Sequence, residues 1–249
     1  MAMSLDQRIG LSTVLLRDSV RQYAPATFAC SFGAEDMVIF DLIQRHDLPI
    51  EIFTLDTGRL HEETYALMQR ARERYARPLQ VMFPQSTAVE AFVRQEGVNA
   101  FYESIELRKR CCAIRKVEPL RRALQGKKLW ITGMRREQSV TRAEMDALSF
   151  DAGNALMKLN PLLDWSEAEV QDYVKRFDVP VNALHARGFP SIGCAPCTRA
   201  VTTGEDARAG RWWWEQPESK ECGLHRDPTG KLVRSNPAPS SEQKVGESQ

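Results

Sequence analysis

Two pairs of cysteines in this sequence could bind metal together. Cys111 and Cys112 are adjacent in the stretch RKRCCAIRK, and Cys194 and Cys197 form a CAPC motif further along the chain. A disulfide between neighbouring cysteines is strained, because adjacent Cα atoms lie only about 3.8 Å apart. The pattern therefore favours four thiolates gathered on one metal centre.

The spacing alone leaves the kind of centre open. Structural zinc sites usually place a few residues between the cysteines of both pairs, which the adjacent pair does not do. In an iron–sulfur cluster each thiolate binds a different iron. Neighbouring side chains at a helix start, where we expect the adjacent pair, diverge by about 100° and suit two corners of a cluster. An iron–sulfur cluster is favoured, with zinc and redox-active dithiols as alternatives.

Positive charge surrounds the adjacent cysteines and would offset the negative charge of such a cluster. The basic residues are Arg108, Lys109, Arg110, Arg115 and Lys116. The alternative interpretation is a solvated basic helix face.

The two remaining cysteines have different surroundings. Cys30 ends an apolar stretch and is interpreted as a packing residue. Cys222 lies in SKECGLH, where Lys220 and His225 could stabilise a thiolate, the nucleophilic form of cysteine. The alternative for Cys222 is a surface thiol without a role.

Three predicted loops carry groups that suit an anionic nucleotide. SFGAED offers backbone N–H groups at a helix start, and DTGR and GMRREQSVTR add charged donors. An ordinary strand-to-helix turn is the alternative for the first loop. The candidate residues are Ser31, Gly33, Asp56, Arg59, Arg135, Arg136 and Arg142. Further along, Arg199, Arg208 and Arg211 could clamp an anion, and Trp212–Trp214 could pack, stack or shield a site from water.

Alternating strands and helices are predicted to hold these loops at one edge of a parallel sheet. The predicted strands are 26–30, 50–56, 79–83 and 128–133. The predicted helices are 5–23, 37–46, 61–76, 86–97 and 117–125. Residues 155–165 are expected to add an edge strand, and a capping box of Ser166 and Glu169 opens a helix over 166–178.

Composition sets limits on the class of protein. With 249 residues, 43% of them apolar, the chain fits a single α/β domain over 1–214 and a flexible tail over 215–249. A net charge of +1 argues against nucleic acid or an anionic membrane as a partner. Neither a membrane span nor a secretory signal is recognisable, so we expect a cytoplasmic protein whose six cysteines stay reduced.

Seven motifs, in their order along residues 31–225, resemble those of the assimilatory adenosine 5′-phosphosulfate reductases. They are SFGAED, LDTGR, KRCCAIRKVEPL, GMRREQS, CAPCTRAV, GEDARAGRWWWE and ECGLH. The resemblance implies a parallel-sheet nucleotide-binding fold like that of the ATP pyrophosphatases (adenine nucleotide alpha hydrolase-like), with helices on both faces. The glycine-rich loop of those enzymes reads SGGxDS. Here Ser31 and Gly33 are kept, but Phe32, Glu35 and Asp36 differ, so ATP cleavage is not expected.

The resemblance also implies roles for individual residues. The metal ligands of one 4Fe-4S cluster per subunit would be Cys111, Cys112, Cys194 and Cys197, and Cys222 would be the nucleophile. The phosphosulfate group would be held by Lys116, Arg142, Arg208 and Arg211. A homo-oligomer is expected as well.

The implied reaction is attack of the Cys222 thiolate on the sulfate sulfur, with departure of AMP and formation of a cysteine S-sulfonate. An external dithiol such as thioredoxin then releases sulfite. We expect the cluster to tune the pocket's electrostatics through Lys116.

Relatives that use the 3′-phosphorylated nucleotide generally lack the two cysteine pairs, so adenosine 5′-phosphosulfate is the favoured substrate. Acceptance of 3′-phosphoadenosine 5′-phosphosulfate, alone or as well, is the alternative. A non-catalytic, zinc-stabilised nucleotide-binding module is a further alternative. A tRNA-modifying enzyme is disfavoured by the altered loop and by the absence of a broad basic stretch.

Overall fold

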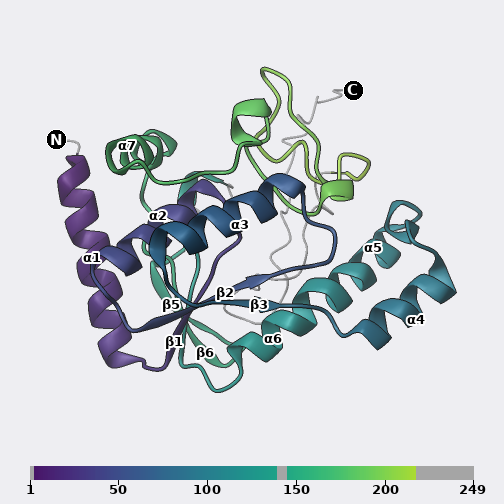
Figure 1. The fold of residues 1–249 in the computed structure, drawn as a ribbon, viewed down its shortest axis with the longest axis horizontal. Coiled ribbons are helices and arrows are strands. Elements are labelled where there is room, and N and C mark those ends of the chain that lie inside the picture. The colour runs from purple at the N-terminus through teal and green to yellow at the C-terminus, as the bar shows by residue number, and fades with distance from the viewer. Residues whose placement is uncertain (1–2, 139–144, 217–249) are drawn as a thin grey trace, which may run out of the picture.

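A six-stranded sheet forms the centre of the computed structural model, which describes residues 3–138 and 145–216 (Figure 1). Its strands are β1 (Ala26–Ala29), β2 (Ile50–Leu55), β3 (Leu79–Met82), β4 (Leu129–Ile131), β5 (Leu148–Asp151) and β6 (Leu156–Leu159). The strand order is β3-β2-β1-β4-β6-β5, and only the β5–β6 pair is antiparallel. The predicted α/β class with a parallel sheet is confirmed.

One strand assignment from the sequence is wrong. Residues 155–165 were expected to add an edge strand, but β6 within this stretch lies between β4 and β5. The edge is β5, which pairs with β6 from Leu148 opposite Leu159 to Asp151 opposite Leu156. The sequence LSFD is short and Phe150 is exposed, so β5 lacks the buried apolar run that identifies a strand.

Helices cover both faces of the sheet, as predicted (Figure 1). They are α1 (Leu5–Gln22), α2 (Ala34–Arg45), α3 (Glu62–Tyr75), α4 (Ser86–Glu96), α5 (Ile105–Cys112), α6 (Glu118–Leu124) and α7 (Glu167–Phe177). Alternate residues of β2 face opposite cores. Ile50 and Ile52 pack with α1, α2, α3 and α7, whereas Phe53 packs with α6.

Local signals account for several helix ends. The predicted capping box is present at α7, where Ser166 Oγ accepts from the Glu169 backbone N–H at 3.2 Å and the Ser166 N–H donates to Glu169 Oε2 at 2.7 Å. Helix α2 begins earlier than predicted, directly after Gly33, so Glu35 and Asp36 lie in its first turn, where they offset the helix dipole.

The adjacent cysteines lie at the end of a helix, not at its start as expected from the sequence. Ser104 caps α5 by accepting from the Leu107 N–H at 3.1 Å, and α5 ends at Cys112. A π-helical turn, Ala113–Val117, then leads into α6. Such turns occur often at functional sites. The sequence analysis missed Ser104, which was the available signal for the start of α5.

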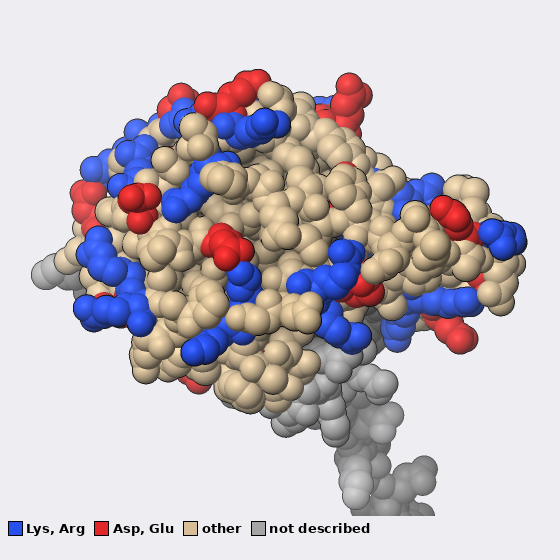
Figure 2. Space-filling model, turned by 60° about the horizontal axis from the view of Figure 1, so that its bottom comes forward, with Lys and Arg blue, Asp and Glu red and all other residues tan. Residues whose placement is uncertain are grey.

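Positive and negative side chains are interspersed on the face shown in Figure 2, in keeping with the net charge of +1. Among the described residues, none of the helices combines the length and the apolar character needed to cross a membrane.

Candidate functional site

The four paired cysteines line a single cavity. It encloses about 320 Å³, part of which is open to solvent, and lies between the end of α5 and the CAPC loop. Four cations, Arg59, Arg108, Arg115 and Lys116, contribute to its wall, together with Phe101 and Pro196. Among the residues that the structure describes, no acidic side chain belongs to this lining. The structure therefore brings together two cysteine pairs that are far apart in the sequence and surrounds them with positive charge.

The donor set of the cavity contains four thiols, which suits a metal centre with several thiolate ligands. Within residues 3–138 and 145–216, no three His, Cys, Asp or Glu side chains are arranged to hold one metal ion. The four paired cysteines border one cavity. A cluster that takes one thiolate at each iron suits such an arrangement, and cationic walls suit its negative charge. A tetrahedral zinc site would require the four sulfurs to converge on one point.

The thiols of the cavity differ in their readiness to ionise. Burial alone would raise the pKa of Cys194, but the positive charge of Lys116 and a 3.3 Å hydrogen bond with the Thr57 hydroxyl outweigh it, so this pKa is lowered. Burial raises the pKa of Cys197 to about 12, and it also raises that of Cys111. Cys194 is therefore the thiol most ready to become a thiolate among these three.

The DTGR loop after β2 lies against the cysteine cavity. Arg59 Nη1 donates to the Val98 carbonyl at 2.7 Å, and the Arg59 carbonyl accepts from the Ala195 N–H at 2.8 Å. Arg115 Nη1 donates to the Thr57 carbonyl at 2.7 Å. The loop predicted to bind nucleotide thus supports the CAPC loop, and Arg59 lies beside the cysteines. The sequence analysis missed Thr57.

Asp56, the first residue of that loop, is buried and directed into the loop itself. Its Oδ1 accepts from the Gly58 N–H at 2.7 Å and from the Tyr65 hydroxyl at 2.9 Å. Burial, with the neighbouring Asp56 charge, raises the pKa of Tyr65 to about 12. Asp56 therefore fixes the turn that carries Thr57 and Arg59.

In the loop after β1, hydrogen-bond donors pair with a carboxylate in α2, the helix that follows the loop. The Ser31 N–H and hydroxyl donate to Asp36 Oδ2 at 2.5 and 2.6 Å, and the Gly33 N–H donates to Ser31 Oγ at 3.4 Å. Burial raises the pKa of Asp36 to about 6, although the hydrogen bonds from Ser31 oppose this. Asp36 was not among the predicted site residues. The signal available in the sequence was that Asp36, an acidic residue, occupies the last position of the SGGxDS pattern.

The loops after β1 and β4 meet where the strand order reverses direction, the usual ligand position in open parallel sheets. Their approach is so close that a Cβ on Gly133 would lie 2.1 Å from Asp36 Oδ1. Phe32 holds a left-handed backbone with φ 63 in this region. Strained residues of this kind cluster at ligand-binding sites.

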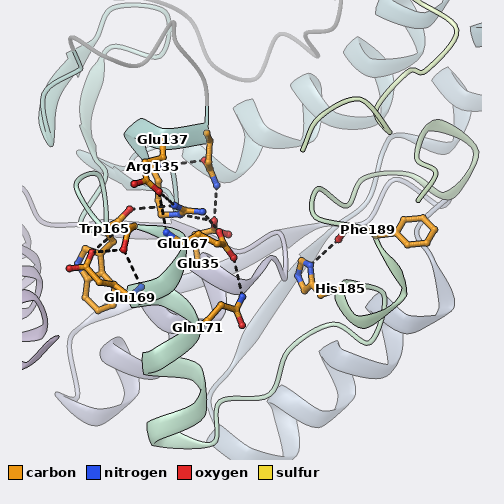
Figure 3. Close-up of polar contacts among 11 residues, drawn as sticks. Glu35, Arg135, Glu137, Trp165, Glu167, Glu169, Gln171, His185 and Phe189 are labelled. Atoms are coloured by element: carbon orange, nitrogen blue, oxygen red, sulfur yellow. Dashed lines mark hydrogen bonds and ion pairs between the residues drawn. The ribbon is translucent and has the colours of Figure 1, made fainter. Parts of the chain in front are cut away.

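Arg135 ties these loops together through ion pairs with carboxylates of the same chain (Figure 3). Its buried guanidinium donates to Glu35 Oε1 at 2.8 Å, to Glu137 Oε2 at 3.2 Å and to Glu167 Oε2. Gln138 Nε2 reaches the same Glu35 oxygen at 2.8 Å. These hydrogen bonds link the first turn of α2 to the loop after β4 and to the start of α7.

The other predicted anion-binding arginines have varied surroundings. Arg136 donates to Asp164 Oδ1 and to the Met145 carbonyl, each at 2.9 Å. Arg208 is half-buried. Arg211 is buried and lies flat against Gly193, where a Cβ would come within 2.4 Å of its Nη2. Two predicted site residues, Arg142 and Cys222, lie outside the described residues.

The five basic residues around the adjacent cysteines separate into two groups. Arg108, Arg115 and Lys116 line the cysteine cavity, as expected for charges that offset a cluster. Arg110 instead pairs with Glu96 on α4 at 2.6 Å, and Lys109 is exposed. Cys30 is buried in the main core, in agreement with its interpretation as a packing residue.

Comparison with known proteins adds family relationships to this geometry. The profile of the phosphoadenosine phosphosulfate reductase domain matches residues 25–200. An adenosine 5′-phosphosulfate reductase of Burkholderia cepacia is 56% identical over 211 residues, covering 85% of this chain and 84% of the relative. One from Allochromatium vinosum is 52% identical over 223 residues, covering 90% and 87%.

Solved structures support the fold. The phosphate complex of phosphoadenylyl-sulfate reductase from Candida auris superimposes with a TM-score of 0.66 at 24% identity, covering 81% of this chain and 99% of that one. The NH3-dependent NAD synthetase of Campylobacter jejuni gives a TM-score of 0.51 at 13% identity, covering 71% and 75%. These likenesses agree with the adenine nucleotide alpha hydrolase-like fold expected from the sequence.

Proposed function

Because the chain belongs to the phosphoadenosine phosphosulfate reductase domain family, we propose that it is an oxidoreductase that reduces adenosine 5′-phosphosulfate to sulfite and AMP in sulfate assimilation. The observation that carries the proposal is the cavity at which both cysteine pairs meet cationic side chains. The relatives named adenosine 5′-phosphosulfate reductase, which match more than four fifths of the chain, support the choice of substrate.

The proposed reaction has two stages. The Cys222 thiolate forms a bond to the sulfate sulfur, and the bond from that sulfur to the bridging oxygen breaks, so AMP leaves with the electron pair. Lys116, Arg142, Arg208 and Arg211 would neutralise the phosphosulfate and the charge that develops on the leaving phosphate. Ser31, Gly33 and Arg136 remain candidates for the nucleotide itself.

The second stage needs a reductant. One thiolate of an external dithiol, thioredoxin or a similar protein, attacks Cys222 Sγ, and sulfite leaves with the bonding pair. The second thiol then resolves the mixed disulfide, so the dithiol supplies both electrons. A homo-oligomer and a cytoplasmic location remain predictions from the sequence and the family resemblance.

We propose a 4Fe-4S cluster, one per subunit, held by Cys111, Cys112, Cys194 and Cys197. The four thiols in the lining and the cations beside them support this assignment. When bound, the cluster would supply a fixed negative charge beside Lys116, whose own charge already acts on Cys194 and Cys197. A brown protein with broad absorbance near 400 nm is expected. A colourless protein with stoichiometric zinc would favour the binding-module alternative.

Single-turnover mass spectrometry tests the reaction. Cluster-loaded protein is incubated with adenosine 5′-phosphosulfate without thioredoxin, and a sulfonate adduct is expected on Cys222. The variant Cys222→Ser should form none. A parallel incubation with 3′-phosphoadenosine 5′-phosphosulfate separates the two candidate substrates. An adduct on another residue, or none at all on active cluster-loaded protein, contradicts the mechanism.

A further inference from the structure

Asp36 places a buried carboxylate where the loops after β1 and β4 meet. The residue lies in the first turn of α2 and is 7% exposed. Its Oδ2 accepts from the N–H and the hydroxyl of Ser31 at 2.5 and 2.6 Å, and the backbone of Gly133 is a further hydrogen-bond partner. Donors from two loops therefore converge on one negative group of the chain itself.

The same donors would suit a phosphate group. Backbone N–H groups on both sides of a left-handed residue, next to a helix start, form a concave site for anions. Phe32 is the left-handed residue here, with φ 63. The N–H groups of Ser31 and Gly33, on either side of it, lead to Asp36 directly or through the Ser31 hydroxyl. The Asp36 carboxylate thus occupies the position in which these groups would hold a phosphate.

The carboxylate is packed directly against the backbone of the loop after β4. A Cβ on Gly133 would lie 2.1 Å from Asp36 Oδ1 and 3.2 Å from the Cβ of Glu35. A phosphate could reach the Ser31 and Gly133 donors only by displacing the Asp36 side chain. The glycine at position 133 is required for this close fit.

Negative charge also surrounds Asp36. Burial raises its pKa to about 6, and the neighbouring charge of Glu35 acts in the same direction. Glu35, Glu137 and Glu167 share the guanidinium of Arg135, so one cation faces three carboxylates in this group (Figure 3). A phosphate brought here would meet like charge in a partly buried setting, which is strongly unfavourable.

The cysteine cavity has the opposite charge. Its wall contains Arg59, Arg108, Arg115 and Lys116. Arg59 belongs to the loop after β2, and β2 pairs in parallel with β1, so both places lie at the carboxyl ends of neighbouring strands. A nucleotide that spans them is oriented by these charges, with its anionic end at the cysteines and its nucleoside at the loop after β1.

We propose that Asp36 is a specificity-determining residue that excludes adenine nucleotides carrying a further phosphate group. The inference rests on the proposed function, in which the ligand is adenosine with a single phosphate and a sulfate. ADP and ATP share the adenosine and the first phosphate with that ligand and would otherwise compete for the site. The excluded group is a phosphate on the 5′ chain or on the 3′ oxygen, and the experiment separates these two positions.

The cost of Asp36 to the fold agrees with a functional role. A carboxylate whose pKa is raised by burial makes the folded state less stable at neutral pH than a neutral side chain would. Groups with strongly perturbed pKa values that persist at a ligand position are typical of functional sites. Asparagine would keep the size of the side chain without this cost, but it would not repel a phosphate.

Calorimetric titration of the full chain with AMP, ADP and ATP tests the proposal. Asp36→Asn removes the charge but still fills the space, whereas Asp36→Ser also frees the donors. The matched control is Asp47→Asn, which removes a 99% exposed carboxylate just beyond the other end of α2. The affinity for ATP relative to AMP should rise at least about tenfold in Asp36→Ser, by less in Asp36→Asn, and remain unchanged in Asp47→Asn.

Adenosine 3′,5′-bisphosphate, titrated in parallel, locates the excluded phosphate. A gain confined to ADP and ATP assigns the effect to the 5′ chain, and a gain confined to the bisphosphate assigns it to the 3′ oxygen. Asp36→Asn is expected to be at least as stable as the wild type at neutral pH, so misfolding does not obscure its result. If both Asp36 variants keep the wild-type affinity ratios, or gain equally for AMP and for the longer nucleotides, the inference is wrong.

Pyrophosphate tests the inference without the nucleotide. It should bind Asp36→Ser at least about tenfold more tightly than it binds the wild type or Asp47→Asn. If the wild type binds neither AMP nor adenosine 5′-phosphosulfate, the proposed function fails, and the pyrophosphate titration still decides the role of Asp36. Equal pyrophosphate affinities for all three proteins would in that case contradict it.

Discussion

Replacing Arg135 with glutamine should destabilise the protein far more than breaking a surface ion pair. Arg135 is 5% exposed and its partner Glu35 is 15% exposed, so the variant leaves a mostly buried carboxylate without its cation. Loss of one partner from a buried pair costs roughly 3–5 kcal/mol. The other two carboxylates, on Glu137 and Glu167, are 58% and 60% exposed, and water can replace the arginine there.

The expected change in the free energy of unfolding follows from these contributions. The Glu35 partner accounts for most of the cost, and each exposed partner adds at most about 1 kcal/mol. Glutamine can still donate one hydrogen bond to Glu35, which recovers about 1 kcal/mol. We therefore expect a net loss of about 3 kcal/mol. For a chain of this length that lowers the melting temperature by roughly 6–12 °C.

Thermal unfolding followed by circular dichroism, with urea titration as a second measure, provides the assay. Arg176→Gln is the control, because Arg176 pairs with Asp6 where the two side chains are 48% and 71% exposed. Its effect should stay below about 1 kcal/mol. If Arg135→Gln lowers stability no more than Arg176→Gln does, the interpretation of Arg135 as the tie between the loops is wrong.

Three further predictions concern the loop after β1 and the cysteine cavity. The folded pKa of Asp36, raised from 3.8 to about 6, implies stability that is present below about pH 4 and lost as the pH rises through about 6. In urea titrations the loss should approach about 3 kcal/mol and be absent in Asp36→Asn. Cys194→Ser should abolish absorbance near 400 nm, whereas Cys30→Ala, in the core, should keep it; equal spectra would contradict the cluster assignment. Lys116→Ala should weaken substrate affinity and slow S-sulfonate formation with the cluster intact, and unchanged values would exclude its proposed role.

Local patterns in the sequence were sufficient to predict much of the architecture. Strand and helix assignments depend on the periodicity of neighbouring residues, and the capping box of Ser166 and Glu169 spans a single helical turn. The cysteine pairs could be recognised because their residue type and short internal spacing carry the chemistry. Cys30 could be separated from them because it lies in an apolar run.

Strand β5 was missed because its own sequence carries little of the periodicity by which the other strands were predicted. It has a half-exposed, four-residue sequence, and its pairing with β6 decides its structure more than its own composition does. The start of α5 was misplaced because the helix was predicted to begin at the adjacent cysteines. The residue that caps the helix is Ser104, which lies several positions earlier.

The partners of the charged side chains were decided by the tertiary structure alone. Arg135 and Glu35 are 100 positions apart, and Arg108 and Glu215 are 107 apart. A sequence shows that an arginine can bind an anion, but it does not show whether that anion is a ligand or a carboxylate of the same chain. That choice depends on which loops the sheet order brings together and on how much water is excluded there. The sequence by itself thus determined the fold class and the chemistry available, and the folded chain determined which of those charges face a cavity and which hold its walls together.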